Sequence, residues 1–235
     1  MKIGLLLIAT GKYDVFLKPL IDSVNKYFFK DDDVEIFLFA DKVPNFLHSN
    51  RLKITHIPIE HKPFPYSTLY RYKYFWQNKD CIKTDYVFYC DADMLFVDHV
   101  GHEILPDNTS GLVAVNHPGF AKTGGWGSLN VFKESLAYVS PENRGPYCAG
   151  GFQGGTLDSY LNVCRNLSEN ITTDENNGII AEHNDESHWN SLLSIIGYQK
   201  EQVKILSHEY CMSDADISGS PKILALTKDH KYFQQ

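Results

Sequence analysis

The segment from Lys2 to Thr10 constrains the fold most strongly, because it is largely apolar over the length of one β-strand (KIGLLLIAT). A strand that is apolar on both faces is typical of a parallel sheet covered by helices on both sides. The residues that follow, Phe16 to Phe28, place apolar side chains at helical spacing, with Asp14 as a candidate N-cap. The chain is therefore predicted to begin with a buried strand and an amphipathic helix.

The same alternation continues along the first half of the chain. We predict strands from Val34 to Ala40 and from Leu52 to Ile59, separated by a turn-rich segment from Asp41 to Asn50. A helix with interleaved aromatic and basic side chains is expected from Ser67 to Gln77, and a short buried strand from Tyr86 to Cys90. This alternation predicts an α/β fold with a mostly parallel sheet flanked by helices.

The second half is predicted to add three short strands and two helices. No internal repeat, low-complexity tract or dividing linker is visible, so we expect one domain over residues 1–235. A glycine-rich stretch, Thr123 to Ser128, is expected to form a mobile loop. The strands are Leu112 to Val115, Lys204 to Leu206 and Ile223 to Thr227, and the helices are Leu157 to Leu167 and Asp185 to Ile196.

Charge and composition exclude several classes of protein. A formal net charge of −7 argues against nucleic acid as a partner, because such binding depends on clustered Lys and Arg. The apolar run Ile3 to Ala9 is too short to span a bilayer, so we expect no transmembrane segment. Five cysteines without a Cys-x-x-Cys pair indicate neither a disulfide framework nor a zinc ribbon, and reduced thiols favour a cytoplasmic location.

The most informative motif is Asp91-Ala92-Asp93, which directly follows an apolar strand. Ligands of open α/β folds bind at the carboxyl ends of strands, and two carboxylates there can hold a hard divalent cation that binds a diphosphate. The spacing alone fits a solvated turn equally well. Asp214-Ala215-Asp216 has the same letters without a preceding strand, and we predict a surface loop for it.

Three further segments carry groups that are able to act on a ligand. His117 to Phe120 follows a predicted strand, although a lone His near apolar residues is more often structural. Gly150 to Gly155 allows the backbone to approach a ligand closely, and a tight turn is the simpler interpretation. His183 to His188 collects candidate bases and nucleophiles at a helix start, where Asp and Ser are also ordinary caps.

These four segments, in this order, resemble motifs of the histo-blood-group ABO family, glycosyltransferase family 6. The resemblance extends from about Gly4 to His230 and implies a GT-A fold that binds a UDP-sugar donor at the strand ends. It also implies a glycan acceptor. The matching segments are Asp91 to Gly101 (D-x-D-M-x-F-x-D-H-V-G), His117 to Phe120 (H-P-G-F), Ala149 to Gly155 (the donor-specificity loop) and Asp185 to Asn190 (D-E-S-H-x-N).

The resemblance also assigns roles on the nucleotide side. Asp91 and Asp93 would bind a divalent metal, most simply Mn²⁺, together with ribose or diphosphate. Many prokaryotic and phage members carry Asn-x-Asn and need no metal, whereas this chain keeps both aspartates, so we expect metal dependence. The remaining residues are Ile8, Ala9 and Tyr13 for uracil and ribose, Arg71 near the donor sugar, and Lys228 closing over the diphosphate.

On the sugar side, Asp185 matches a residue that binds the donor sugar. Glu186 matches the carboxylate beneath the anomeric carbon, which acts as nucleophile or as stabiliser of an oxocarbenium-like transition state. The triplet Ala149, Gly150 and Gly151 favours UDP-GalNAc. His117 and His183 are the expected acceptor contacts.

The chain departs from the mammalian pattern in two segments that shape the acceptor side. His183-Asn184 replaces Trp-His, and Asn130 to Phe132 replaces Glu-Arg-Arg. The main expectation is a retaining transferase that forms an α1,3 linkage from UDP-GalNAc. Alternatives are a retaining transferase that uses UDP-Gal or UDP-Glc, and a glycan-binding protein without turnover. A metal-dependent phosphoesterase is less favoured, because its metal cluster needs more His and Asp ligands.

Overall fold

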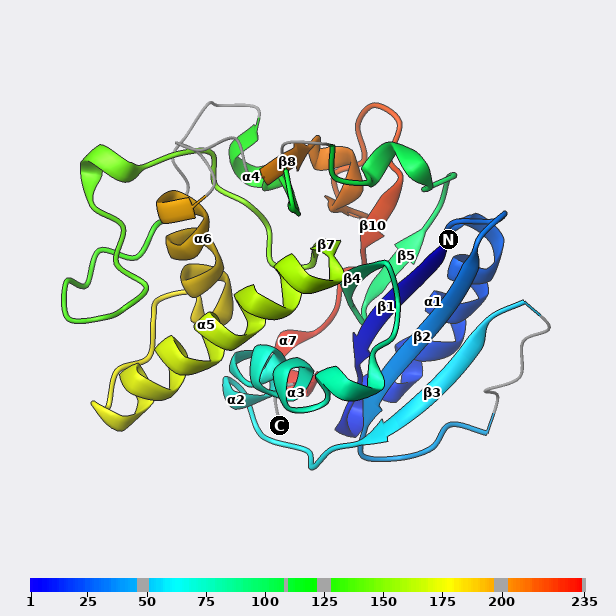
Figure 1. The fold of residues 1–235 in the computed structure, drawn as a ribbon, viewed down its shortest axis with the longest axis horizontal. Helices are drawn as coiled ribbons and strands as arrows, with labels where there is room; N and C mark the ends of the chain where they lie inside the picture. Colours follow the sequence, from blue (N-terminus) through cyan, green and yellow to red (C-terminus); the bar gives the residue numbers. More distant parts are fainter. Residues whose placement is uncertain (46–50, 108–109, 122–127, 197–202, 234–235) are drawn as a thin grey trace.

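The computed structural model describes residues 1–45, 51–107, 110–121, 128–196 and 203–233. Its centre is a seven-stranded sheet in the order β3-β2-β1-β4-β7-β6-β8, with only β7 antiparallel to its neighbours (Figure 1). This confirms the mostly parallel α/β sheet that the alternation predicts, and it is consistent with the GT-A fold that the family resemblance implies. The strands are β1 (Lys2–Ile8), β2 (Asp33–Ala40), β3 (Lys53–Pro58), β4 (Tyr86–Asp91), β6 (Leu112–Val115), β7 (Phe152–Thr156) and β8 (Val203–Leu206).

Helices cover both faces of the sheet because β1 is apolar on both. Leu5 and Leu7 pack in one cluster with residues of α1 (Asp14–Tyr27), whereas Leu6 packs in the opposite cluster. That second cluster includes residues of α3 (Arg71–Gln77), α5 (Leu157–Asn176) and α6 (Asn184–Ile196). The predicted strand and first helix are confirmed.

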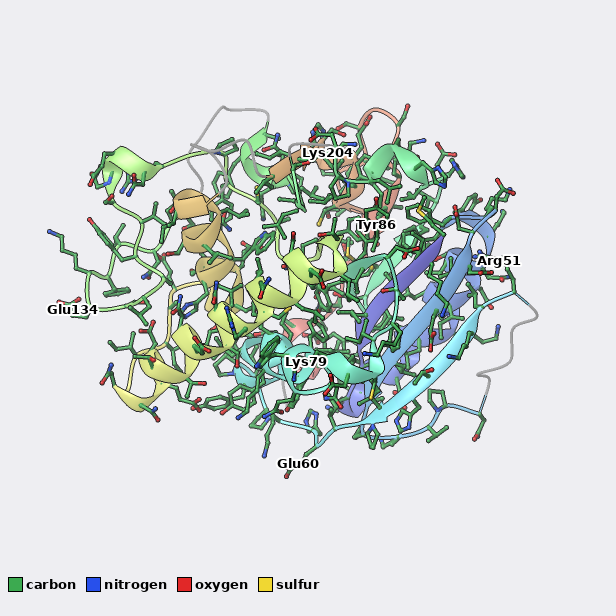
Figure 2. All side chains as sticks on the ribbon, in the orientation of Figure 1. Arg51, Glu60, Lys79, Tyr86, Glu134 and Lys204 are labelled. Atoms are coloured by element: carbon green, nitrogen blue, oxygen red, sulfur yellow. The ribbon has the colours of Figure 1, made fainter. Side chains whose placement is uncertain are left out.

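Arg51, which lies just before β3, contacts the C-terminal end of α1 (Figure 2). Its guanidinium donates hydrogen bonds to the carbonyl oxygens of Val24 at 2.8 Å and Phe29 at 3.1 Å. Each of these carbonyls also accepts a backbone N–H, from Phe28 and Asp32 respectively, so Arg51 adds a second donor to each at the C-terminal end of α1.

A smaller sheet of three strands joins the C-terminal segment to the centre of the chain. It comprises β5 (Met94–Phe96), β10 (Ile223–Ala225) and β9 (Met212–Ser213), with β10 between the other two. The Leu226 N–H also donates to the Asp93 carbonyl at 2.8 Å. Because of this pairing, the last described residues, including α7 (His230–Phe233), lie near the carboxyl end of β4.

Several predicted boundaries are wrong for identifiable reasons. Asp14 is the first helical residue and not the N-cap, which is Tyr13. The helix expected from Ser67 is broken at Tyr70 into α2 (Tyr66–Leu69) and α3. The helix from Leu157 continues to Asn176, because Ile171 and Asp174 of its polar second half are buried. Most of the glycine-rich stretch Thr123 to Ser128 lies outside the described residues.

Gly150 to Gly155 does not form a tight turn, because most of it belongs to β7. A Cβ atom on Gly154 would lie 2.4 Å from the Val87 carbonyl oxygen, so only glycine allows β4 and β7 to pair here.

Asp214 to Asp216 forms a turn with exposed residues, as predicted. Among the described helices, none is long and apolar enough to cross a membrane. The remaining short helices are α4 (Pro118–Ala121) and the 3₁₀ turns Gly11–Tyr13, Lys79–Cys81, His102–Ile104, Pro141–Asn143 and His208–Tyr210.

Candidate active site

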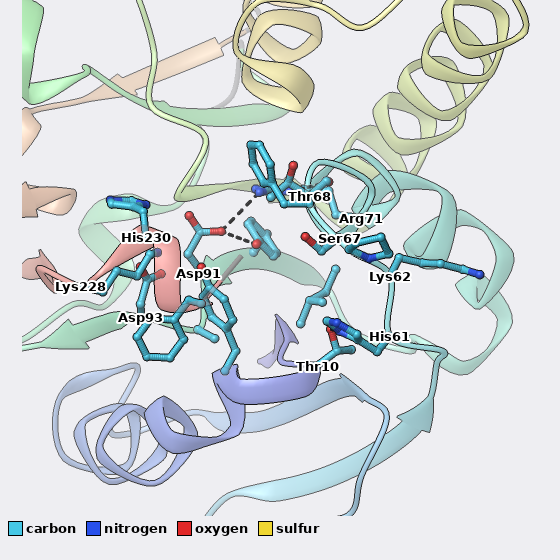
Figure 3. Close-up of a pocket in the computed structure, with 17 residues that line it drawn as sticks. Thr10, His61, Lys62, Ser67, Thr68, Arg71, Asp91, Asp93, Lys228 and His230 are labelled. Atoms are coloured by element: carbon cyan, nitrogen blue, oxygen red, sulfur yellow. Dashed lines mark hydrogen bonds and ion pairs between the residues drawn. The ribbon is translucent and has the colours of Figure 1, made fainter. Parts of the chain in front are cut away.

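Two adjoining cavities lie where β1 and β4 end. The first, of about 220 Å³, is bounded by the end of β1, the start of α3, Asp91 to Asp93 and the C-terminal segment (Figure 3). The second, of about 370 Å³, is bounded by the start of α6 and by Gly150 and Gly151. Both are lined by Phe64, Thr68, Arg71 and Asp91. One elongated site therefore runs along the carboxyl ends of the strands, where ligands of open α/β sheets bind.

Arg71 connects the parts of this site. Its Nε lies 3.0 Å from Asp185 Oδ2, its Nη2 lies 3.4 Å from Asp91 Oδ1, and its Nη1 donates to the Gly150 carbonyl at 3.0 Å. The guanidinium also stacks on the ring of Tyr89 at 4.3 Å. Burial alone would lower the pKa of Arg71, but Asp185, Tyr89 and Asp91 together raise it. Arg71 is therefore a fixed positive charge that links α3, β4, α6 and the segment that enters β7.

Asp91 and Asp93 occupy different environments within the first cavity. Asp91 ends β4 and accepts a hydrogen bond from the buried Tyr89 hydroxyl. Asp93 pairs with the Lys228 ammonium, which lies 5.0 Å from the centre of the Tyr13 ring. Burial and the charge of Asp91 raise the pKa of Asp93, although Lys228 acts in the opposite direction. The C-terminal lysine thus reaches the aspartate motif, and Figure 3 shows the three side chains side by side.

The donor set of the site fits a divalent cation. Five carboxylates line the two cavities, against three cationic side chains. The carboxylates are those of Asp91, Asp93, Glu182, Asp185 and Glu186, and the cations are Lys62, Arg71 and Lys228. Within the described ranges, no three His, Cys, Asp or Glu side chains are arranged to hold a metal by themselves. Asp91 and Asp93 therefore suit a hard cation that takes its other ligands from diphosphate oxygens and water, as Mg²⁺-type ions commonly do.

Glu186 is held in the second cavity by two hydrogen bonds. Its Oε2 accepts from the Gly150 N–H at 2.7 Å, and its Oε1 accepts from the Tyr147 hydroxyl at 2.7 Å. It lies with Asp185 in the first turn of α6, where the helix dipole favours negative charge. Burial raises the pKa of Asp185 to about 6, although Arg71 opposes this shift. Two neighbouring carboxylates thus face different surroundings.

Asn190 fixes the distance between α6 and the segment that enters β7. Its side chain donates to the Cys148 carbonyl and accepts from the Cys148 N–H, both at 2.8 Å. Because Asn190 lies one turn after Glu186, this pair holds Glu186 and Gly150 in register. Asn190 belongs to the D-E-S-H-x-N segment, but the sequence alone predicted no role for it. Tyr147 and Tyr89 were also missed.

Gly150 and Gly151 lie against the Glu186 and Asp91 side chains, respectively. A Cβ atom on Gly150 would lie 3.3 Å from Glu186 Oε2, and one on Gly151 would lie 3.1 Å from Asp91 Oδ2. Ala149 is buried, donates its N–H to the Val115 carbonyl at 2.9 Å, and lines neither cavity. Ala9 is likewise buried and lines neither, whereas Ile8 and Tyr13 line the first cavity.

The two predicted acceptor residues lie in different places. His183 lines the second cavity, and 41% of its side chain is exposed. His117 lines neither cavity; its ring lies 5.5 Å from that of Tyr147 and 5.1 Å from that of Phe120. Its Nδ1 accepts the Gly119 N–H at 3.1 Å, and burial lowers its pKa. His117 is thus part of an aromatic cluster beside the site.

The comparison with known proteins agrees with this geometry. The histo-blood group ABO system transferase 1 of Rattus norvegicus is 30% identical, over 97% of this chain and 67% of its own length. The globoside alpha-1,3-N-acetylgalactosaminyltransferase 1 of Homo sapiens is 28% identical (91% and 62%), and the O-antigen biosynthesis glycosyltransferase WbnI of Escherichia coli is 26% identical (81% of each). Residues 1–233 match the model of glycosyltransferase family 6. The chain therefore belongs to glycosyltransferase family 6 and is a UDP-sugar-dependent glycosyltransferase.

Proposed function

We propose that this single-domain enzyme transfers GalNAc from UDP-GalNAc to a galactoside glycan in α1,3 linkage, with retention of configuration and with a divalent cation at Asp91 and Asp93. The observation that carries the proposal is the meeting of the two cavities at Arg71 and Asp91. In this proposal the nucleoside diphosphate occupies the first cavity and its sugar the second, where Glu186 lies.

The first cavity has the groups that a departing UDP needs. Ile8, Ala9 and Tyr13 belong to the end of β1 and the turn after it, and we assign them to uracil and ribose, with Ala9 contributing through its backbone. As the bond to the sugar breaks, negative charge grows on the β-phosphate, and preorganised positive groups stabilise it. Lys228 and Arg71 supply that charge in this chain. A bound Mn²⁺ would add Lewis-acid stabilisation of the same oxygens.

The second cavity has the groups that a reacting sugar needs. Asp185, paired with Arg71, is suited to accept hydrogen bonds from sugar hydroxyls. The Glu186 carboxylate, with an oxygen fixed by each of two donors, is suited to face a developing positive charge at the anomeric carbon. Both a covalent glycosyl intermediate and a same-face displacement use a carboxylate in this position.

The donor and acceptor assignments rest on smaller features. Gly150 and Gly151 add no side chain to their part of the wall of the second cavity, which leaves space there for an N-acetyl group. The human relative's name specifies an α1,3-N-acetylgalactosaminyltransferase, which supports both donor and linkage. His183 is suited to contact a glycan acceptor at the cavity, and we place His117 on the acceptor side behind it. The five free cysteines favour a reducing, cytoplasmic environment.

The test is an assay of UDP release from UDP-GalNAc, UDP-Gal and UDP-Glc, with Mn²⁺ or EDTA and with or without a fucosylated galactoside. We expect UDP-GalNAc and acceptor to give the fastest release, EDTA to abolish it, and NMR of the product to show an α1,3 linkage. Glu182→Gln, on the rim of the same cavity, is the matched control for Glu186→Gln. Acceptor binding without UDP release from any donor would instead indicate a glycan-binding protein.

A further inference from the structure

Tyr147 lies beside Glu186, although neither motif nor charge points to it in the sequence. Only 2% of the residue is exposed, and its hydroxyl oxygen lies 2.7 Å from Glu186 Oε1. The Gly150 N–H holds the other carboxylate oxygen at the same distance. One donor per oxygen fixes the plane of a carboxylate, whereas a single donor leaves the group free to rotate about its last bond.

The ring of Tyr147 is itself held by two separate segments. The rings of His117 and Phe120, from the H-P-G-F turn, lie 5.5 Å and 5.3 Å from it. Leu129 and Val139 complete the apolar cluster on the other segment. The H-P-G-F motif therefore has a structural consequence in this chain, since it determines where the Tyr147 hydroxyl lies.

The Tyr147 hydroxyl acts only as a donor to Glu186. Burial first, and the negative charge of Glu186 second, raise the pKa of Tyr147 well above its ordinary value. The hydroxyl therefore keeps its proton at neutral pH. Its bond to the carboxylate is a charge-assisted hydrogen bond, which is stronger than a bond between neutral groups.

We propose that Tyr147 is a positioning residue for the transfer reaction, which holds the Glu186 carboxylate in the orientation required beneath the donor sugar, with the H-P-G-F turn as its support. The inference rests on the role proposed above for Glu186. The proposed role separates binding from turnover, because Tyr147 lines neither cavity. Loss of its hydroxyl should slow the reaction without weakening the binding of nucleotide.

The first test is Tyr147→Phe, which keeps the ring packing and removes one oxygen atom. We expect kcat for transfer and for donor hydrolysis to fall about 10- to 100-fold, as when a charge-assisted bond that orients a catalytic group is lost. The Kd for UDP should stay within about twofold of the wild-type value, since Tyr147 acts only through Glu186. Tyr160→Phe is the matched control, because it removes another buried hydroxyl that has no hydrogen-bond partner in the described structure.

A double-mutant cycle with Glu186→Gln distinguishes positioning from general loosening. If Tyr147 acts through the carboxylate, adding Tyr147→Phe to Glu186→Gln should change kcat by less than about twofold. A further loss as large as in the wild-type background, or wild-type kcat in Tyr147→Phe alone, overturns the inference. Absence of turnover in the wild-type enzyme with every donor would instead refute the proposed function.

Phe120→Leu provides a second variant should Tyr147→Phe not fold. It loosens the support of the ring without touching the hydroxyl or the carboxylate. We expect kcat to fall while the Kd for UDP and the circular-dichroism spectrum are unchanged. Equal losses in kcat and UDP affinity, or no loss at all, would contradict the role of the H-P-G-F turn.

Discussion

Gly151 provides the sharpest quantitative test of the site, because a single methyl group there would press on the cation-binding region. A Cβ atom at this position would lie 3.1 Å from Asp91 Oδ2, 3.3 Å from Met94 Sδ and 3.4 Å from Cys211 Sγ. The last two atoms belong to buried residues, so the Asp91 carboxylate must give way. Gly151→Ala is therefore expected to displace the Asp91 carboxylate, for which we propose a role in binding the cation and diphosphate, and to narrow the proposed sugar pocket.

The magnitude follows from the closeness of these contacts. Adding a methyl group to a well-packed position costs about 1 to 3 kcal/mol. We expect that loss to appear in the binding of UDP in the presence of Mn²⁺, which is about 5- to 150-fold in Kd. A second effect, on the sugar pocket, should reduce the preference for UDP-GalNAc over UDP-Gal by about 1 to 3 kcal/mol, as one methyl-sized contact does.

Two measurements separate these effects. Calorimetric titration with UDP and Mn²⁺ reports on the first cavity, which includes Asp91, because UDP lacks the hexosyl group that would occupy the second cavity. The ratio of kcat/KM for the two donors reports on the sugar pocket alone. Unchanged UDP affinity in Gly151→Ala would refute the displacement of Asp91, and a wild-type preference for UDP-Gal would refute the donor assignment. If thermal melting shows that Gly151→Ala does not fold, the role of Gly151 is only to allow the local backbone conformation.

Four further predictions follow from the same geometry. Asp93→Asn should cost at least ~2 to 3 kcal/mol in transition-state stabilisation, measured as kcat/KM at saturating Mn²⁺, and full turnover of the wild type in excess EDTA would contradict metal dependence. Glu186→Gln should lower kcat far more than UDP-GalNAc affinity, because the neutral amide keeps the shape but not the charge; equal losses would make Glu186 a binding residue. Arg71→Lys should lower kcat/KM about 10- to 100-fold, since an ammonium cannot reproduce the three contacts of the guanidinium, and wild-type activity would show that charge alone suffices. Burial lowers the pKa of His188 from 6.5 to about 4, so the folded protein binds fewer protons than the unfolded chain between these values. Its free energy of unfolding should therefore fall by about 3 kcal/mol as the pH is lowered through that window, and urea unfolding of His188→Asn should show a flatter dependence; parallel curves would rule this out.

The sequence predicted the fold wherever the signal was local. The apolar run at Lys2 to Thr10 and the helical spacing after it identify β1 and α1, because burial on both faces leaves a continuous apolar pattern. Strand β7 was missed since Gly154 and Gly155 have no side chains to display a pattern, and its pairing depends on the distant Val87 and Gly111. The polar second half of α5 was missed for the related reason that few of its residues are buried.

The candidate site likewise contains residues that a local sequence pattern reveals and residues that no local pattern reveals. Asp91 and Asp93 were found because they follow a visible strand, and Lys228 was placed only through the family resemblance. Tyr147 was not found, because its bond to Glu186 joins residues 39 positions apart and a tyrosine in an apolar segment is ordinarily part of a core. Long-range hydrogen bonds of single side chains leave no periodic trace in a sequence.

The opposite placement of the two chain ends has a practical consequence for attaching the enzyme to a surface. Strand β1 begins at Lys2, at the end of the sheet away from the first cavity, and ends at Ile8, which lines that cavity. His230 and Phe233 of the C-terminal segment also line it. Phe233 also packs against the rings of Tyr13 and Phe16. Immobilisation or fusion through the N-terminus therefore leaves the cavity open to bulky glycans, whereas a bulky C-terminal fusion partner would stand at its entrance.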